Sequence, residues 1–84
     1  MTINLEKRVK IIVADVLKIP LEQVTVELAI GDIPEWDSVA NIRLLQKLEE
    51  IFDIEIDAID ALEADDVFDF FKLVENYIHP DLII

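Results

Sequence analysis

The 84-residue chain contains no cysteine, a single glycine and a single histidine. Without cysteine it has no disulfide, no thiolate nucleophile and no zinc–sulfur site. Its one glycine, Gly31, cannot make a glycine-rich phosphate-binding loop. The one histidine, His79, lies beside Pro80 far along the chain, so nucleophilic catalysis lacks an obvious base. We therefore expect a non-catalytic protein.

Basic residues are also few, with 7 Lys and Arg against 19 Asp and Glu and a net charge of −12. Residues 1–18 have a slight positive excess, and residues 19–84 carry almost all of the negative charge. Such a surface repels phosphate backbones and anionic lipids, so nucleic acids and membranes are poor partners. The charge either steers the protein toward enzymes with basic patches or serves only to keep a hydrophobic domain in solution.

Long apolar runs are absent as well. Charged residues interrupt the N-terminal stretch, which has neither the apolar core of a signal peptide nor the length of a membrane span. With 54% hydrophobic residues, the chain has ample material for one core but is too short to build two. We expect a single domain, monomeric and cytoplasmic.

Acidic residues are spaced in one place like a calcium-binding loop. Asp53, Glu55 and Asp57 match the first ligand positions of such a loop. Ala58 and Ala64, however, occupy the positions that require a glycine and a bidentate acid. The sequence therefore predicts no metal site.

Apolar residues recur at helical spacing in three segments, which predict helices over about residues 3–18, 38–52 and 66–78. Good N-cap residues precede each segment: Thr2 or Asn4, Asp37 or Ser38, and Asp65 or Asp66. Pro80 ends the last helix. The apolar stripe predicted for the second helix is Val39, Ile42, Leu45, Leu48 and Phe52, widened by Leu44 and Ile51, and such a wide arc implies packing against more than one neighbour. The face predicted for the last helix is Val67, Phe68, Phe71, Val74, Tyr77 and Ile78.

The remaining segments are shorter or irregular. Residues 19–36 form a long connection that contains Pro20, Gly31 and Pro34. Residues 53–57 alternate polar and apolar, which we interpret as an extended connector with its isoleucines in the core. Residues 59–62 predict one short helical turn. These elements together predict an all-α fold, a small four-helix bundle of three main helices and one short third helix.

Ser38 is the candidate site. Ser and Asp are both preferred N-cap residues, because their side-chain oxygens accept from unpaired amides of the first helical turn. Here Asp37 and Ser38 stand side by side, and only one is needed. If Asp37 caps the helix, the Ser38 hydroxyl points outward at the positive end of the helix dipole, a position that favours an attached phosphodiester.

The residues around Ser38 resemble the acyl carrier proteins. These proteins share an Asp-Ser-Leu motif, a following helix that ends in Leu-Glu-Glu-x-Phe, and an extended segment that ends in Ile. The matching residues are Asp37-Ser38-Val39, Leu44-Leu45 and residues 48–56. Length, acidity, the long first connection and the short third helix are also similar, so the resemblance covers nearly the whole chain.

The resemblance implies that Ser38 carries 4′-phosphopantetheine, transferred from coenzyme A by a phosphopantetheinyl transferase. The thiol of this arm would hold acyl intermediates as thioesters for a specialised fatty-acid, polyketide or related pathway, with loading and processing enzymes as partners. Two alternatives stay open: an unmodified acidic adaptor that binds proteins through the second helix, and an aminoacyl carrier loaded by an adenylating ligase.

The departures from the family concern the surface that faces partners. Ala40 and Arg43 stand where the fatty-acid carriers have acidic residues, Lys47 follows one turn later, and Val39 replaces the usual leucine. We therefore expect Val39, Ala40, Arg43 and Lys47 to contact partners that differ from a general fatty-acid synthase. For Trp36 we favour packing of its indole over the start of the second helix, with a direct partner contact as the alternative. Phe68 replaces a common glycine, which implies a bulkier core.

Overall fold

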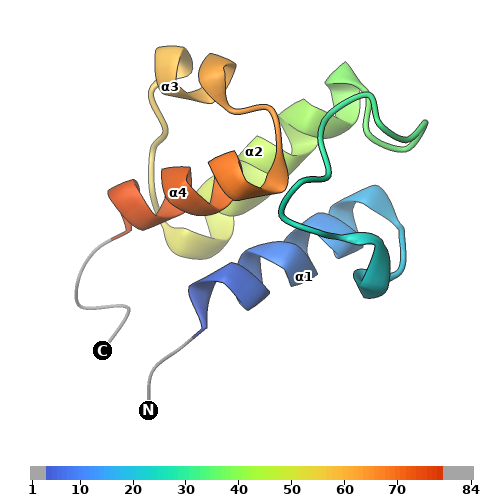
Figure 1. Ribbon diagram of the computed structural model, residues 1–84. Coiled ribbons are helices and arrows are strands. Elements are labelled where there is room, and N and C mark those ends of the chain that lie inside the picture. The colour runs from blue at the N-terminus through green and yellow to red at the C-terminus, as the bar shows by residue number, and fades with distance from the viewer. Residues whose placement is uncertain (1–3, 79–84) are drawn as a thin grey trace.

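The computed structural model describes residues 4–78 and consists of helices and their connections (Figure 1). This part of the chain contains α1 (Leu5–Leu17), the 3-10 turn η1 (Leu21–Gln23), α2 (Ser38–Phe52), α3 (Ala58–Glu63) and α4 (Val67–Tyr77). Over residues 4–78 there is no β-strand, only an isolated bridge between Ala29 and Asp66. The prediction of a small all-α bundle with one short helix is confirmed.

Each α-helix begins directly after a residue whose side-chain oxygen accepts a hydrogen bond from an amide of the first turn. The caps are Asn4, Asp37, Asp57 and Asp66, and the donors are the amides of Lys7, Ala40, Ile59 and Asp69. Because these amides have no partner inside the helix, each cap stabilises it by roughly 1 kcal/mol. Thr2, Pro80 and the apolar tail at residues 82–84 lie outside the described residues.

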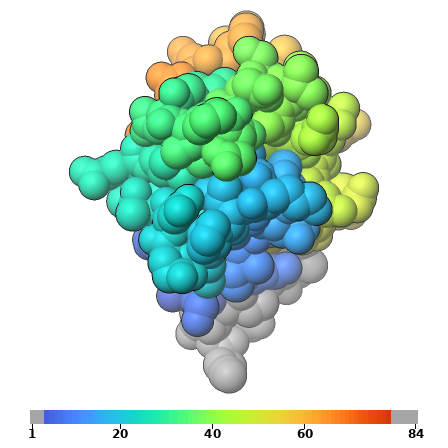
Figure 2. Space-filling model, turned by 90° about the vertical axis from the view of Figure 1, so that its right-hand side faces the viewer, coloured from blue at the N-terminus to red at the C-terminus, as the bar shows by residue number. Residues whose placement is uncertain are grey.

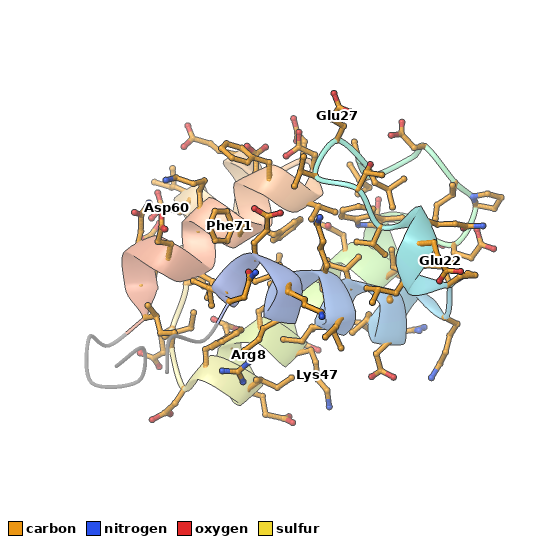
Figure 3. The ribbon with its side chains drawn as sticks, turned by 60° about the horizontal axis from the view of Figure 1, so that its bottom comes forward. Arg8, Glu22, Glu27, Lys47, Asp60 and Phe71 are labelled. Atoms are coloured by element: carbon orange, nitrogen blue, oxygen red, sulfur yellow. The ribbon has the colours of Figure 1, made fainter. Side chains whose placement is uncertain are left out.

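The core lies where α1 packs against α2 and α4. The face that α1 buries is the predicted one, with Val9, Ile12, Val13 and Leu17. Arg8 lies over the ring of Phe52, with its guanidinium carbon 4.9 Å from the ring centroid, and so covers one end of the contact between α1 and α2 (Figure 3). Every helix within residues 4–78 is too short or too polar to cross a membrane.

α2 buries only part of the apolar arc predicted for it. Its buried residues are Ala40, Leu44, Leu48 and Phe52. Val39 and Ile42, which we assigned to the core, are 57% and 56% exposed. The apolar arc of α2 is wider than the surface that its neighbours cover, so its first two turns present aliphatic side chains to solvent.

α4 also differs from its prediction. Phe70 and Leu73 are buried beside Val67 and Val74, whereas Phe68 is 48% exposed. Phe68 therefore does not enlarge the core, as the comparison with the family had implied. Its ring lies 6.3 Å from that of Phe71 at the surface of α4.

The long connection between α1 and α2 is held against the start of α4. Backbone hydrogen bonds join Ile30 N to Asp65 O (2.9 Å), Val67 N to Leu28 O (3.0 Å) and Phe68 N to Val26 O (2.9 Å). Gly31 then adopts a φ of 88°, which a residue with a side chain rarely tolerates. The chain consequently turns at Gly31 and enters α2 from a fixed direction.

α3 follows the predicted extended connector. Ile54 is buried and Ile56 is partly buried, as the alternating pattern indicated. The amide of Ile56 donates to Glu49 Oε2 of α2 at 2.9 Å, which holds the connector to that helix. α3 itself buries no side chain fully, and it lies beside α4 and away from α1 (Figure 1).

Candidate modification site at the start of α2

Ser38 is the first residue of α2, and Asp37 is the residue that caps the helix. Asp37 Oδ1 accepts from the amide of Ala40 at 2.8 Å, and the Asp37 carbonyl accepts from Asn41 N at 2.9 Å. The Asp37 side chain therefore caps α2, and the Ser38 side chain is not needed for this role. Of the two readings open for Ser38 from the sequence, the structure favours the one in which its side chain has no capping role.

Ser38 is exposed, and its hydroxyl makes no hydrogen bond to any other described residue. The backbone amides of Ser38 and Val39 also have no acceptor within residues 4–78. These donors belong to the first turn of α2, at the positive end of its dipole, and such an environment stabilises an anion. Figure 2 shows the connection and the beginning of α2 (cyan to green) at the surface of one face of the molecule.

Trp36 anchors the segment that leads to Ser38. Its side chain is completely buried, and its ring centroid lies 6.0 Å from that of Phe70. The indole Nε1 donates to Asn41 Oδ1 of α2 at 2.9 Å. Since Trp36 has no accessible surface, we remove it from the predicted partner contacts. Sequence reasoning missed Asn41, whose position one turn after the Asp37 cap was the available signal.

The exposed surface next to Ser38 is apolar and basic. Val39 and Ile42 are both more than half exposed, and Arg43 is exposed without an ion pair to any described residue. Lys47 lies one turn further along and pairs with Glu50 at 3.5 Å. Ala40 is buried at 7% exposure, so it too leaves the predicted partner surface. Val39, Arg43 and Lys47 remain accessible.

An apolar pocket opens between α2 and α3. It has a volume of about 380 Å³ and is lined by Ile30, Asn41, Ile42, Leu45, Ala58, Ala61, Leu62 and Ala64. Asn41 and Ile42 lie about one helical turn after Ser38, so the pocket begins close to the candidate site. Sequence reasoning missed this pocket, although Ala58, Ala61 and Ala64 recur at a spacing of three residues along α3 and its C-cap.

A second, polar cleft of about 230 Å³ separates α3 from α4. Its lining includes Asp60, Glu63, Asp69, Asn76 and Tyr77. The Tyr77 hydroxyl donates to Asp60 and accepts from the amide of Asp57 at 3.2 Å. The pKa of Tyr77 is raised above its ordinary value of 10.0, chiefly because of the hydrogen bond to the Asp60 carboxylate. His79 lies outside the described residues.

The chain matches no protein-family model. The interpretation of the site consequently depends on the motif around Ser38 and on the geometry of α2.

Proposed function

We propose that this protein is a carrier that holds acyl groups on a prosthetic arm attached to Ser38. The observation that carries the proposal is that the Ser38 hydroxyl has no structural role in the described part of the chain. It is exposed and unpaired among residues 4–78 at the start of a helix that Asp37 already caps. A serine with a structural role at this position would normally make the capping bond itself.

The residues present fit a phosphodiester-linked group. The Ser38 oxygen would form the ester, and the amides of Ser38 and Val39 are free to donate to its phosphate oxygens. When attached, 4′-phosphopantetheine supplies a thiol for thioester formation, which a chain without cysteine otherwise lacks. The role of the protein is to present the hydroxyl, orient the arm and offer a surface to the enzymes that load and unload it.

The pocket between α2 and α3 favours an apolar acyl cargo over an amino acid. Asn41 provides its one polar side chain, and aliphatic side chains and alanines form the rest of its lining. An alkyl chain would gain free energy by leaving water there, whereas an ammonium group would lose its hydration without a carboxylate among the lining residues. We therefore rank the acyl carrier above the aminoacyl carrier.

Incubation with coenzyme A and a promiscuous phosphopantetheinyl transferase tests the proposal. We expect the intact mass of the wild type to increase by one phosphopantetheine and the mass of Ser38→Ala to stay unchanged. Ser38 is the only serine, so Thr25→Ala, which removes an exposed hydroxyl in the connection, is the matched control and should be modified like the wild type. Modification of Ser38→Ala, or no modification of the wild type, contradicts the carrier and favours the adaptor.

The cargo is tested separately on the modified protein. We expect an octanoyl group on the arm to raise the melting temperature more than a glycyl group, because only the alkyl chain can fill the apolar pocket. Ala61→Leu narrows the pocket and should reduce the octanoyl effect. Equal melting temperatures for the two loaded forms would contradict an apolar cargo.

A further inference from the structure

The side-chain amide of Asn41 has a fixed orientation. An indole nitrogen can only donate, so the Asn41 atom that meets Trp36 Nε1 at 2.9 Å is the carbonyl oxygen Oδ1. Trp36 is completely buried and its ring lies beside that of Phe70, so the core holds the donor of this bond in place. The amide nitrogen Nδ2 is left with two N–H groups for other partners.

These two N–H groups have no acceptor among residues 4–78. In this part of the chain no buried side-chain polar atom lacks a hydrogen-bond partner, so the unpaired Nδ2 must keep accessible surface. Asn41 is also the one polar side chain that lines the apolar pocket between α2 and α3. The pocket therefore offers a ligand hydrogen-bond donors but no free side-chain acceptor, because Oδ1 is already paired with Trp36.

Among the pocket residues on α2, Asn41 lies nearest to Ser38 along the helix axis. It follows Ser38 by three residues, which corresponds to about 4.5 Å of axial rise. Leu45 follows Ser38 by about two turns, and the α3 side of the pocket is made of alanines and Leu62. A chain that enters from Ser38 would therefore meet the donors of Asn41 before it reaches the aliphatic part of the lining.

This arrangement discriminates between cargo groups by their hydrogen-bonding atoms. A saturated chain would remove water from Nδ2 without replacing its hydrogen bond, which is unfavourable. An amide or a hydroxyl group could accept from Nδ2, but its own N–H or O–H would find no side-chain acceptor in the pocket. A ketone oxygen only accepts, so it satisfies Nδ2 and leaves no donor unpaired.

We propose that Asn41 is a specificity-determining residue and that the cargo is an oxoacyl chain, whose ketone oxygen accepts from Asn41 Nδ2 while its alkyl part lies against Leu45 and Ala61. This inference rests on the proposed function, because it takes the cargo to be attached through Ser38. Its test uses a synthetic chain instead of the prosthetic arm, so a failure of the oxoacyl preference is distinguishable from a failure of Ser38 to be modified.

A synthetic tether at position 38 tests the preference. The protein has no cysteine, so Ser38→Cys introduces a single thiol, which is alkylated with a chain of four methylene groups that ends in a methyl ketone. The reference chain has a C=CH₂ group in place of the ketone and so nearly the same shape. In nitrogen-15 NMR spectra, the Asn41 side-chain amide signal, identified by its loss in Asn41→Asp, should move further downfield with the ketone chain than with the alkene chain.

Asn41→Asp separates the two roles of Asn41, because a carboxylate still accepts from Trp36 Nε1 but has no N–H to donate. We compare the melting temperatures of the ketone and alkene forms. Their difference should favour the ketone form by roughly 2–8 °C more with Asn41 than with Asn41→Asp, as expected for one hydrogen bond in a small domain. Ile42→Val is the matched control, since it alters the same pocket without a polar atom and should preserve the difference.

If Asn41 serves only as the acceptor for Trp36, Asn41→Asp will leave the difference between the two chains unchanged, and that result overturns the proposal. An Asn41 amide signal that responds equally to both chains overturns it too. A third chain carries a hydroxyl in place of the ketone and should give a lower melting temperature than the ketone chain. An equal or higher value would show that the pocket does not select an oxo group.

Discussion

Replacement of Trp36 tests whether the core holds the segment that presents Ser38. The indole is completely buried, contacts the ring of Phe70 and donates to Asn41 Oδ1 at 2.9 Å. Trp36→Ala removes all three interactions and leaves a cavity beside the start of α2. Trp36→Phe keeps most of the ring contact with Phe70 and loses the hydrogen bond to Asn41.

The expected magnitudes follow from these contacts. Trp36→Ala should lower the free energy of unfolding by about 3–5 kcal/mol, the usual cost of removing a large buried aromatic side chain. A domain of 84 residues has a total stability of about 4–13 kcal/mol, so this loss is a large part of the whole. Trp36→Phe should cost about 1–3 kcal/mol, because it loses one hydrogen bond and part of the buried area.

Urea unfolding followed by far-ultraviolet circular dichroism measures these differences without depending on the single tryptophan as a probe. Asn41→Ala is the companion variant, since it removes the acceptor and leaves the indole in place. Its effect should not add to that of Trp36→Phe, because both remove the same bond. If Trp36→Ala unfolds at the same urea concentration as the wild type, Trp36 does not anchor the segment.

Two further predictions concern Tyr77 and Arg43. Followed by ultraviolet absorbance, the pKa of Tyr77 should lie above 10.0 and fall in Asp60→Asn, since the Asp60 carboxylate raises it. The pKa of Tyr77 is higher in the folded state than in the unfolded state, so the Tyr77 hydroxyl stabilises the fold fully below pH 10.0. This stabilisation is lost as the pH rises through the folded-state pKa. An unchanged Tyr77 pKa in Asp60→Asn would contradict this prediction. Arg43→Glu should raise kcat/KM with generic fatty-acid enzymes that carry basic docking patches by about twofold to tenfold at low salt, and weaken the native partner. Lys7→Glu makes the same charge change in the first turn of α1, and the starts of α1 and α2 lie at opposite ends of the molecule (Figure 1). An equal effect of Lys7→Glu would show that Arg43 lies outside the interface.

Helix positions and the role of Asp37 could be predicted because their causes are local. A cap depends on a side chain and on amides two or three residues away, and each of the four α-helices within residues 4–78 begins after such a residue. The bounds predicted for α2 agree with those observed. The outward position of Ser38 followed from the same reasoning, since Asp37 needed only the amide of Ala40 to cap the helix.

The buried faces of α2 and α4 could not be predicted with the same success. Val39 and Ile42 share the helical spacing of a core stripe, and so do Leu44 and Leu48. Periodicity defines an apolar arc but does not say which part of a wide arc the neighbouring helices cover. Phe68 and Phe70 posed the same ambiguity, and the structure buries Phe70, whose ring lies 6.0 Å from that of Trp36.

By itself, the sequence determined the all-helical class, the helix starts and the candidate serine, because each depends on residues within one or two turns. Only the tertiary structure decided that Trp36 packs beside Phe70, that an apolar pocket lies beside Ser38 and that Tyr77 joins α4 to α3. The partners of Tyr77 lie 17 and 20 residues away along the chain, and the ring nearest to Trp36 belongs to Phe70. Contacts of this kind exist only after the helices have packed, and the free energy of that packing depends on the whole core rather than on any one segment.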